Sequence, residues 1–369
     1  MFSDNREVRM KRNFRSHQVP SLLLLAVVCS LLGSSQPASA QDGPTIVKDS
    51  IRARAYTHSS YHKNFDVWSW VPLVEFAVNG PIASGDQLFV EFSLPGRGLW
   101  AKTDCETEET EAGRRMRTSC GGGDQIPEEK AVTQLGYYTF AIRLRNPLSG
   151  GAATTLFTGK AKVAKIHSGE AGPHFVNHFD YYVDQDWKLP IGYVYIAPGH
   201  GVPDFFPPRL YVTLWFPGEP IKLEGHLLYQ GKPVTSDDCA GSSGTSILTT
   251  HLTKAVWDEI TCEFRYVYKT NPAPEHISKD APLHELTTHP GEYELKLLRE
   301  GKLARSLKFS VAEDGSIVEN GIATDNKLGN DRVIVPVKVL GTQDGAWNKL
   351  AWKTDAFYGN PLTGFTALP

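Results

Sequence analysis

Apolar residues alternate with polar ones along much of the chain, and this period of two constrains the fold more than any other feature. Between residues 87 and 94, every second residue is apolar, as at Leu88, Val90 and Phe92. Successive side chains of a β-strand point to opposite faces, so the pattern predicts half-buried antiparallel strands and an all-β chain. The alternation recurs at Tyr138, Phe140, Ile142 and Leu144, at Ile260, Cys262, Phe264, Tyr266 and Tyr268, at Tyr293, Leu295 and Leu297, and at Leu307, Phe309 and Val311.

The first forty residues have the organisation of a secretory signal peptide. Basic residues precede an apolar run over residues 21–32, and small residues at Ala38 and Ala40 follow it. This order predicts export by a Sec-type signal with cleavage near Ala40, and a secreted or periplasmic location. The alternative is an uncleaved anchor, but the run is shorter than the about 20 apolar residues that a membrane helix needs. No other stretch is apolar enough to span a membrane, so none is expected in the mature chain.

Four cysteines remain after the predicted cleavage, because Cys29 lies inside the apolar run. An even number of cysteines in an exported chain indicates disulfide bonds, and four cysteines allow three pairings. A zinc site is the alternative, but the Cys-x-x-Cys spacing typical of such sites does not occur.

The two halves of the chain repeat one order of features. An apolar strand near a proline (residues 72–82 and 208–221) is followed by a cysteine, a second cysteine, a strand that begins Gly-x-Tyr and a further apolar strand. We therefore predict two copies of one β-sandwich domain. Because each cysteine pair then falls in its own copy, we expect the disulfides Cys105–Cys120 and Cys239–Cys262.

The Gly-x-Tyr strand start resembles the late strand of tandem bacterial immunoglobulin-like and fibronectin-type domains. In such domains a tyrosine near this strand start donates back to the backbone and fixes a corner. The resemblance implies that structural role for Tyr138 and Tyr293. The cysteines depart from the immunoglobulin pattern because both precede the tyrosine in each half. The resemblance therefore concerns architecture, identifies no specific family and imports no active site.

Segments rich in proline and glycine, together with changes in composition, set the expected domain boundaries. We predict a signal peptide at 1–40, a first sandwich at 45–195, a connector at 196–207, a second sandwich at 208–340 and an aromatic-rich tail at 341–369.

Motifs for catalysis and metal binding are weak. There is no Gly-x-Ser-x-Gly sequence, and all mature cysteines are assigned to disulfides. His58 and His62, like His174 and His178, are four residues apart. On a strand that spacing separates the imidazoles by about 13 Å, which is too far to share one metal. Aspartates near residues 180–186 and 325–331 do not follow the calcium-loop pattern. We therefore assign no catalytic, cofactor-binding or metal-binding residue.

Aromatic residues are the most suggestive candidates for ligand contact. Trp68, Trp70 and Trp187 could stack on a sugar or a peptide through their flat ring faces. The alternative is that they fill the core and the domain interface, as most aromatic residues of β domains do. The formal net charge of −3 does not favour a nucleic-acid partner.

These observations favour an exported, non-catalytic binding or structural module of the periplasm or cell surface. Carbohydrate binding or adhesion ranks first, so the expected partner is a glycan or another cell-surface protein. The alternative is a secreted hydrolase whose site lies in the cleft between the two sandwiches.

Overall fold

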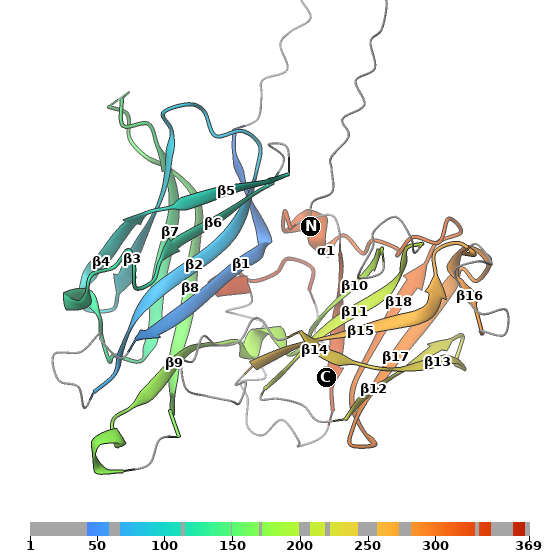
Figure 1. The fold of residues 1–369 in the computed structure, drawn as a ribbon. Helices are drawn as coiled ribbons and strands as arrows, with labels where there is room; N and C mark the ends of the chain where they lie inside the picture. The colour runs from blue at the N-terminus through green and yellow to red at the C-terminus, as the bar shows by residue number, and fades with distance from the viewer. Residues whose placement is uncertain are drawn as a thin grey trace, which may run out of the picture. The chain divides into compact units, whose positions relative to one another are not determined.

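The computed structural model describes residues 43–58, 67–111, 115–148, 150–169, 172–198, 207–217, 222–242, 257–272, 282–328, 332–340 and 357–365. These residues belong to one compact unit that begins at Gly43 (Figure 1). The predicted signal peptide, most of the predicted connector, and Trp347 and Trp352 of the predicted tail lie outside the described residues.

Two antiparallel sheets form in the first half of the described chain. One has the order β1-β2-β6-β5 and the other the order β4-β3-β7-β8-β9. Buried residues from both sheets, such as Val74 on β2 and Phe92 on β3, belong to one hydrophobic core, as the alternation predicts. The strands are β1 (Thr45–His58), β2 (Ser69–Asn79), β3 (Gln87–Leu94), β4 (Gly98–Asp104), β5 (Glu106–Glu111), β6 (Arg115–Gly121), β7 (Gly136–Arg145), β8 (Thr154–His167) and β9 (Phe179–Asp184).

One ten-stranded sheet forms in the second half. Its path is β13-β12-β17-β18-β19-β10-β11-β15-β14, and β16 pairs with β15. The sheet is barrel-like and nearly closed, because its end strands β13 and β14 are separated in sequence by Cys239 alone. The strands are β10 (Ile191–Ala197), β11 (Arg209–Pro217), β12 (Leu223–Tyr229), β13 (Lys232–Asp238), β14 (Ala240–Ser242), β15 (Trp257–Tyr268), β16 (His284–Glu285), β17 (Gly291–Arg299), β18 (Lys302–Val311) and β19 (Val333–Val339).

The all-β prediction is confirmed, but the second half differs from the expected pair of separate sheets. β10 and β19 pair in antiparallel register, with Tyr193 opposite Ile334, and their ladder joins what would otherwise be two sheets. In the first half the corresponding strands β1 and β9 are linked by a side chain, because the Tyr181 amide donates to Thr57 Oγ1 at 2.7 Å. The pairing also places β10 in the second sheet, although the expected boundary at 195 assigns most of it to the first domain.

The strand order of the first half recurs in the second. β1-β2-β6-β5 corresponds to β10-β11-β15-β14, and β4-β3-β7-β8-β9 corresponds to β13-β12-β17-β18-β19. The match extends to single bonds: the Cys105 amide donates to the Leu88 carbonyl at 2.9 Å, and the Cys239 amide donates to the Leu223 carbonyl at 3.2 Å. Cys120 and Cys262 likewise both lie opposite a buried valine on the neighbouring strand.

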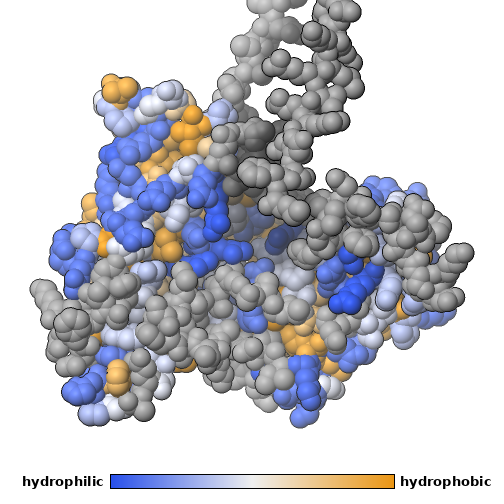
Figure 2. Space-filling model, in the orientation of Figure 1, coloured by the Kyte–Doolittle hydropathy of each residue, from blue (hydrophilic) through white to orange (hydrophobic). Residues whose placement is uncertain are grey.

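The described helices are short, namely the 3-10 turns η1 (Glu128–Lys130), η2 (Pro173–Phe175), η3 (Asp186–Lys188) and η5 (Leu286–Thr288), the α-helical turn α1 (Ile322–Asp325) and the helical residues 357–359. Among the described residues, no helix has the length and apolar character needed to cross a membrane. On the face drawn in Figure 2, hydrophilic residues cover much of the described surface, with smaller apolar areas between them.

The C-terminal segment, residues 357–365, packs into the core of the first half. Phe357, Tyr358, Leu362 and Phe365 are all buried there. The Ala53 amide of β1 donates to the Tyr358 hydroxyl at 3.3 Å, and Asn360 Nδ2 donates to the Thr158 carbonyl of β8 at 3.0 Å. The segment therefore contacts one strand of each sheet.

Candidate functional site

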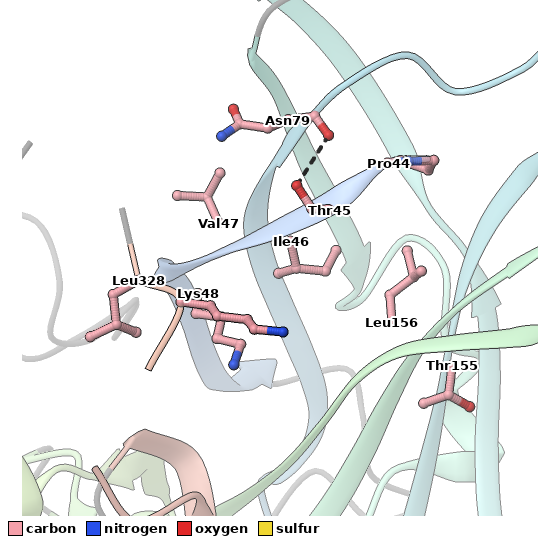
Figure 3. A pocket seen from close by; sticks show the side chains of 10 residues that line it. Pro44, Thr45, Ile46, Val47, Lys48, Asn79, Thr155, Leu156 and Leu328 are labelled. Carbon is pink, nitrogen blue, oxygen red and sulfur yellow. Dashed lines mark hydrogen bonds between the residues drawn. The ribbon is translucent and has the colours of Figure 1, made fainter. Parts of the chain in front are cut away.

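A pocket of about 430 Å³ lies where the start of β1 meets β8 and the residues that follow α1 (Figure 3). This volume is within the roughly 300–1,000 Å³ that is typical of small-molecule sites. Two lysines, two threonines and an asparagine supply its polar groups, and apolar residues form the rest. The described lining residues are Pro44, Thr45, Ile46, Val47, Lys48, Asn79, Thr155, Leu156, Lys327 and Leu328.

An irregularity in β1 positions the first lysine. The pairing of β1 with β2 shifts register between Val47 and Arg52, so Lys48 lies in a bulged stretch. Ser50 stabilises this bulge because its hydroxyl donates to the Val47 carbonyl at 2.6 Å and accepts from the Ala77 amide at 2.7 Å. Bulges of this kind redirect side chains out of the regular alternation.

The turn after α1 positions the second lysine. Ile322, Ala323 and Leu328 are buried and anchor this turn to the core of the first half. The Leu328 amide donates to the Ala323 carbonyl at 2.9 Å, and Lys327 adopts a left-handed backbone with φ of 53°. This is the geometry of a helix C-terminal cap, where glycine is the usual residue.

Asn326 ties the two sides of the pocket together. Its carbonyl accepts a hydrogen bond from Lys48 Nζ at 3.0 Å. Its side-chain amide exchanges two bonds with Thr363 of the C-terminal segment, at 2.9 Å and 2.8 Å. The C-terminal segment therefore holds the turn that places Lys327 beside Lys48.

The electrostatics of the pocket are positive. Burial lowers the pKa of the Lys48 ammonium below its ordinary value, and the charge of Lys327 lowers it further. None of the described residues that line the pocket is acidic. The two ammonium groups therefore repel each other across a site that offers no lining carboxylate to offset them.

A second groove of about 360 Å³ lies over β3, β7 and β8 and is lined by Glu91, Arg143, Lys160 and the C-terminal segment. The Glu91 carboxylate of this groove is paired within the chain. Arg143 Nε is 3.2 Å from Glu91 Oε2, and Lys102 Nζ is 3.7 Å from Glu91 Oε1. Because Glu91 offsets part of the charge in this groove and Lys160 Nζ lies 4.6 Å from the centroid of the Tyr137 ring, the lysine pocket, whose described lining includes no carboxylate, is the better candidate for an anionic ligand.

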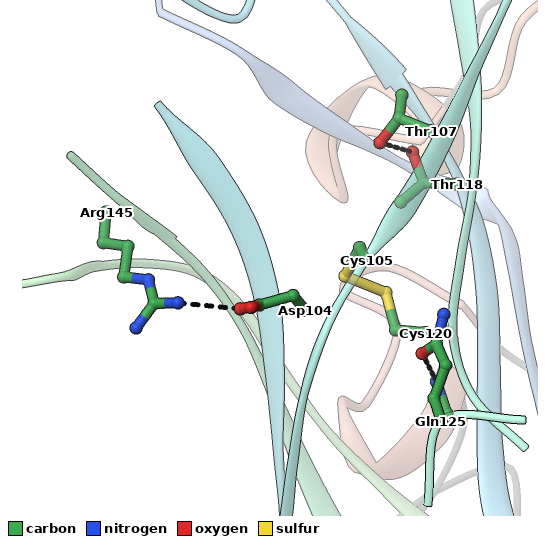
Figure 4. The surroundings of a disulfide bond; sticks show 8 residues. Asp104, Cys105, Thr107, Thr118, Cys120, Gln125 and Arg145 are labelled. Atoms are coloured by element: carbon green, nitrogen blue, oxygen red, sulfur yellow. Dashed lines mark hydrogen bonds and ion pairs between the residues drawn. A yellow bond between two sulfur atoms is a disulfide. The ribbon is translucent and has the colours of Figure 1, made fainter. Parts of the chain in front are cut away.

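The predicted disulfides are both present. Cys105 is bonded to Cys120, and Cys239 is bonded to Cys262. Figure 4 shows the first bond between Asp104, which pairs with Arg145 at 2.8 Å, and the Gly121–Gln125 turn, in which the Gly121 amide donates to Gln125 Oε1 at 2.6 Å. Each bond cross-links residues of one half only.

The two predicted structural tyrosines are buried but bond differently. The Tyr293 hydroxyl donates to the His289 carbonyl at 2.8 Å, four residues upstream, which is the contact expected of a tyrosine corner. The Tyr138 hydroxyl donates at 3.4 Å to the Arg54 carbonyl on β1, far upstream in sequence. Tyr138 therefore links the two sheets of the first half.

The tryptophans predicted to contact a ligand lie in the interior. Trp68, Trp70 and Trp187 are 3%, 1% and 7% exposed. Trp68 stacks on His178 with ring centroids 4.5 Å apart, Trp70 packs edge-on against Trp100 at 5.3 Å, and Trp187 packs against Tyr358 at 5.2 Å. Because neighbouring rings cover these indoles, the structure favours the packing alternative.

Of the two histidine pairs weighed as metal ligands, the structure describes one, His174 and His178. His174 is exposed, whereas His178 is buried against Trp68. His62 and the side chain of His58 lie outside the described residues. Within the described part of the chain, no group of three or more His, Cys, Asp or Glu residues is placed to hold a metal ion.

Sequence reasoning missed the lysine pocket. Lys48 and Asn326 are 278 residues apart, and no local pattern connects them. The one available signal was Asp325-Asn326, a dipeptide typical of a turn, directly before Lys327. Nothing in the sequence indicates that this turn lies beside β1.

Comparisons with known proteins assign no family. No protein-family model matches the chain, and no curated protein matches it. A solved structure described as "Biofilm associated protein - BSP domain" is similar to 83% of this chain and 61% of its own, with 7% identity and a TM-score of 0.17. The chain thus spans less than two thirds of that protein, and we base no conclusion on a likeness at this level.

Proposed function

We propose that this protein is an exported, non-catalytic binding module that acts in the periplasm or at the cell surface and binds a glycan in the lysine pocket. Two disulfides support export, because such bonds form and persist in oxidising compartments. The predicted signal peptide, cleaved near Ala40, supplies the route.

The architecture behind this proposal is a pair of related immunoglobulin-like units. The repeated strand order, the disulfide in each half and the Tyr293 corner support it. We propose that the units lie close to residues 45–195 and 208–340, with the boundary moved so that β10, the counterpart of β1, begins the second unit. In this interpretation the C-terminal segment completes the core of the first unit.

The observation that carries the binding function is the pocket itself. It is concave, it is large enough for a small saccharide unit, and hydroxyl, amide and ammonium groups line it together with apolar side chains. Threonine hydroxyls and an asparagine amide can both donate to and accept from sugar hydroxyls. By contrast, the tryptophans that first suggested sugar binding are buried in the core.

A glycan array with the chain from residue 41 onward tests this function. Thr155→Trp places a large ring at the pocket, whereas Thr154→Trp alters the preceding position of β8, whose side chain points to the other face of the strand. Both threonines are exposed, so both variants should fold. We expect wild type and Thr154→Trp to bind the same glycans, and Thr155→Trp to lose at least tenfold in affinity.

Scattering on the same samples separates binding from assembly. If the wild type binds no glycan and has the mass of a large assembly by multi-angle light scattering, the protein is a structural subunit and the proposal is wrong. The hydrolase alternative receives no support from the two pockets, since the described linings include no acid in one and Glu91 alone in the other.

A further inference from the structure

We propose that the lysine pocket selects an acidic glycan, in which a carboxylate or sulfate substituent on a sugar lies between Lys48 and Lys327. This inference rests on the proposed function, because it assumes that the pocket is the ligand site. It adds the chemical class of the ligand and the two residues that recognise it.

The pocket carries an unbalanced positive charge. Two ammonium groups line one cavity, and the described lining includes no carboxylate. Lys48 Nζ donates a hydrogen bond to one neutral group, the Asn326 carbonyl, at 3.0 Å. An ammonium group can donate three hydrogen bonds, so it can also donate to a ligand. An anion would relieve the lysine repulsion and accept from both ammonium groups through charge-assisted hydrogen bonds.

Residue 327 is a lysine at a position of the turn where glycine is usual. Its left-handed backbone is a cap position where glycine meets no steric penalty, while other residues cost about 1 kcal/mol. The chain nevertheless carries a lysine there, and that lysine lines the pocket. Lys222 shares this backbone outside the pocket, so the position of Lys327 in the lining is what supports a binding role.

The neutral part of the lining also suits a sugar. Thr45, Asn79 and Thr155 bring hydroxyl and amide groups to the same cavity. Thr45 Oγ1 donates only a long bond, 3.5 Å, to the Asn79 carbonyl. These groups suit the hydroxyls of a sugar ring better than the chain of a fatty acid or a bare inorganic ion. Lysines act as point charges, so carboxylate and sulfate substituents are both accommodated.

The test is calorimetric titration with four probes at fixed low salt: a galacturonate trisaccharide, a sulfated trisaccharide, a neutral galactose trisaccharide and sodium sulfate. We expect either acidic trisaccharide to bind at least tenfold more tightly than the neutral one, and sodium sulfate to bind more weakly than both. Affinity for the acidic trisaccharides should fall as the salt concentration rises, because salt screens the attraction between the two ammonium groups and the anionic substituent.

Two variants and a matched control assign the recognition. Lys48→Gln keeps a hydrogen-bond donor without the charge, and Lys327→Gly removes the charge while relieving the left-handed backbone. Each should weaken acidic-trisaccharide binding about tenfold or more. Lys222→Gly makes the same change at an exposed lysine with φ of 50° outside the pocket, and should bind like wild type. Since Lys327→Gly should melt at or above the wild-type temperature, its loss of binding cannot be attributed to unfolding.

The outcomes separate this inference from the proposed function. Tighter binding of the neutral trisaccharide, or acidic binding that both lysine variants retain, overturns the inference and leaves a glycan-binding module. Sodium sulfate binding as tightly as the acidic sugars overturns the assignment of a sugar. If no saccharide binds here or on the array, both proposals are wrong.

Discussion

At the scale of single residues, burial changes the pKa of a titratable side chain, and His284 is the example. His284 is half-buried, its Nε2 lies 2.8 Å from the Tyr293 hydroxyl, and its ring stacks on His289 with centroids 4.2 Å apart. Burial, and then the neighbouring His289, lower the pKa of His284 to about 4. The folded protein therefore binds this proton more weakly than the unfolded chain does, for which the pKa is 6.5.

The consequence is a loss of stability in acid. Because the folded pKa is depressed, the free energy of unfolding should fall as the pH drops from about 6.5 to about 4. After allowance for partial solvent exposure, we expect His284 to contribute about 1 kcal/mol of this loss. Urea unfolding of wild type and His284→Gln at pH 7 and pH 4.5 measures it. Identical pH dependence in the two proteins would contradict the assigned pKa.

A glycine in β8 gives a second prediction at this scale. A Cβ built on Gly159 would lie 2.3 Å from Cζ of Phe140, a buried ring on the adjacent strand, so the core would have to shift. Gly159→Ala should destabilise the protein by about 1–3 kcal/mol. Gly43→Ala is the control, since a Cβ there meets nothing within 4 Å. Thermal melts that are equal for the two variants would show that this part of the core is loosely packed.

At the scale of elements, strands were predictable and their partners were not. Alternation located β3, β7, β15, β17 and β18 because each buries one face, and the repeated order of features gave the correct disulfides because each cysteine pair falls within one half. The β10–β19 ladder could not be predicted, since it pairs Ile191 with Pro336 across the second half. The lysine pocket was hidden for the same reason: its residues come from four segments that lie far apart in the sequence.

The C-terminal segment provides the prediction at the element scale. Tyr358 is 2% exposed, packs against Phe140 and Trp187, and accepts the bond from the Ala53 amide. Tyr358→Ala should cost about 3–5 kcal/mol, whereas Tyr358→Phe loses only the hydroxyl and should cost about 1 kcal/mol. Chemical denaturation distinguishes them. Near-zero cost for Tyr358→Ala would mean that the segment does not pack as described.

At the scale of the whole molecule, two halves with one strand order are each cross-linked by their own disulfide. Each closed loop should contribute roughly 3 kcal/mol by limiting the unfolded chain. That arrangement, together with export, is the basis of the proposed binding module. The two disulfides require an oxidising compartment. The lysine pocket lies on the first half and on the segments that pack against that half.

The most direct measurement is mass spectrometry of a non-reduced digest of the protein recovered from the exporting cell. The account predicts a mature chain that begins near residue 41, one cross-linked peptide pair containing Cys105 and Cys120, and a second pair containing Cys239 and Cys262. Free thiols at these four positions, or a cross-link that joins the two halves, would contradict it.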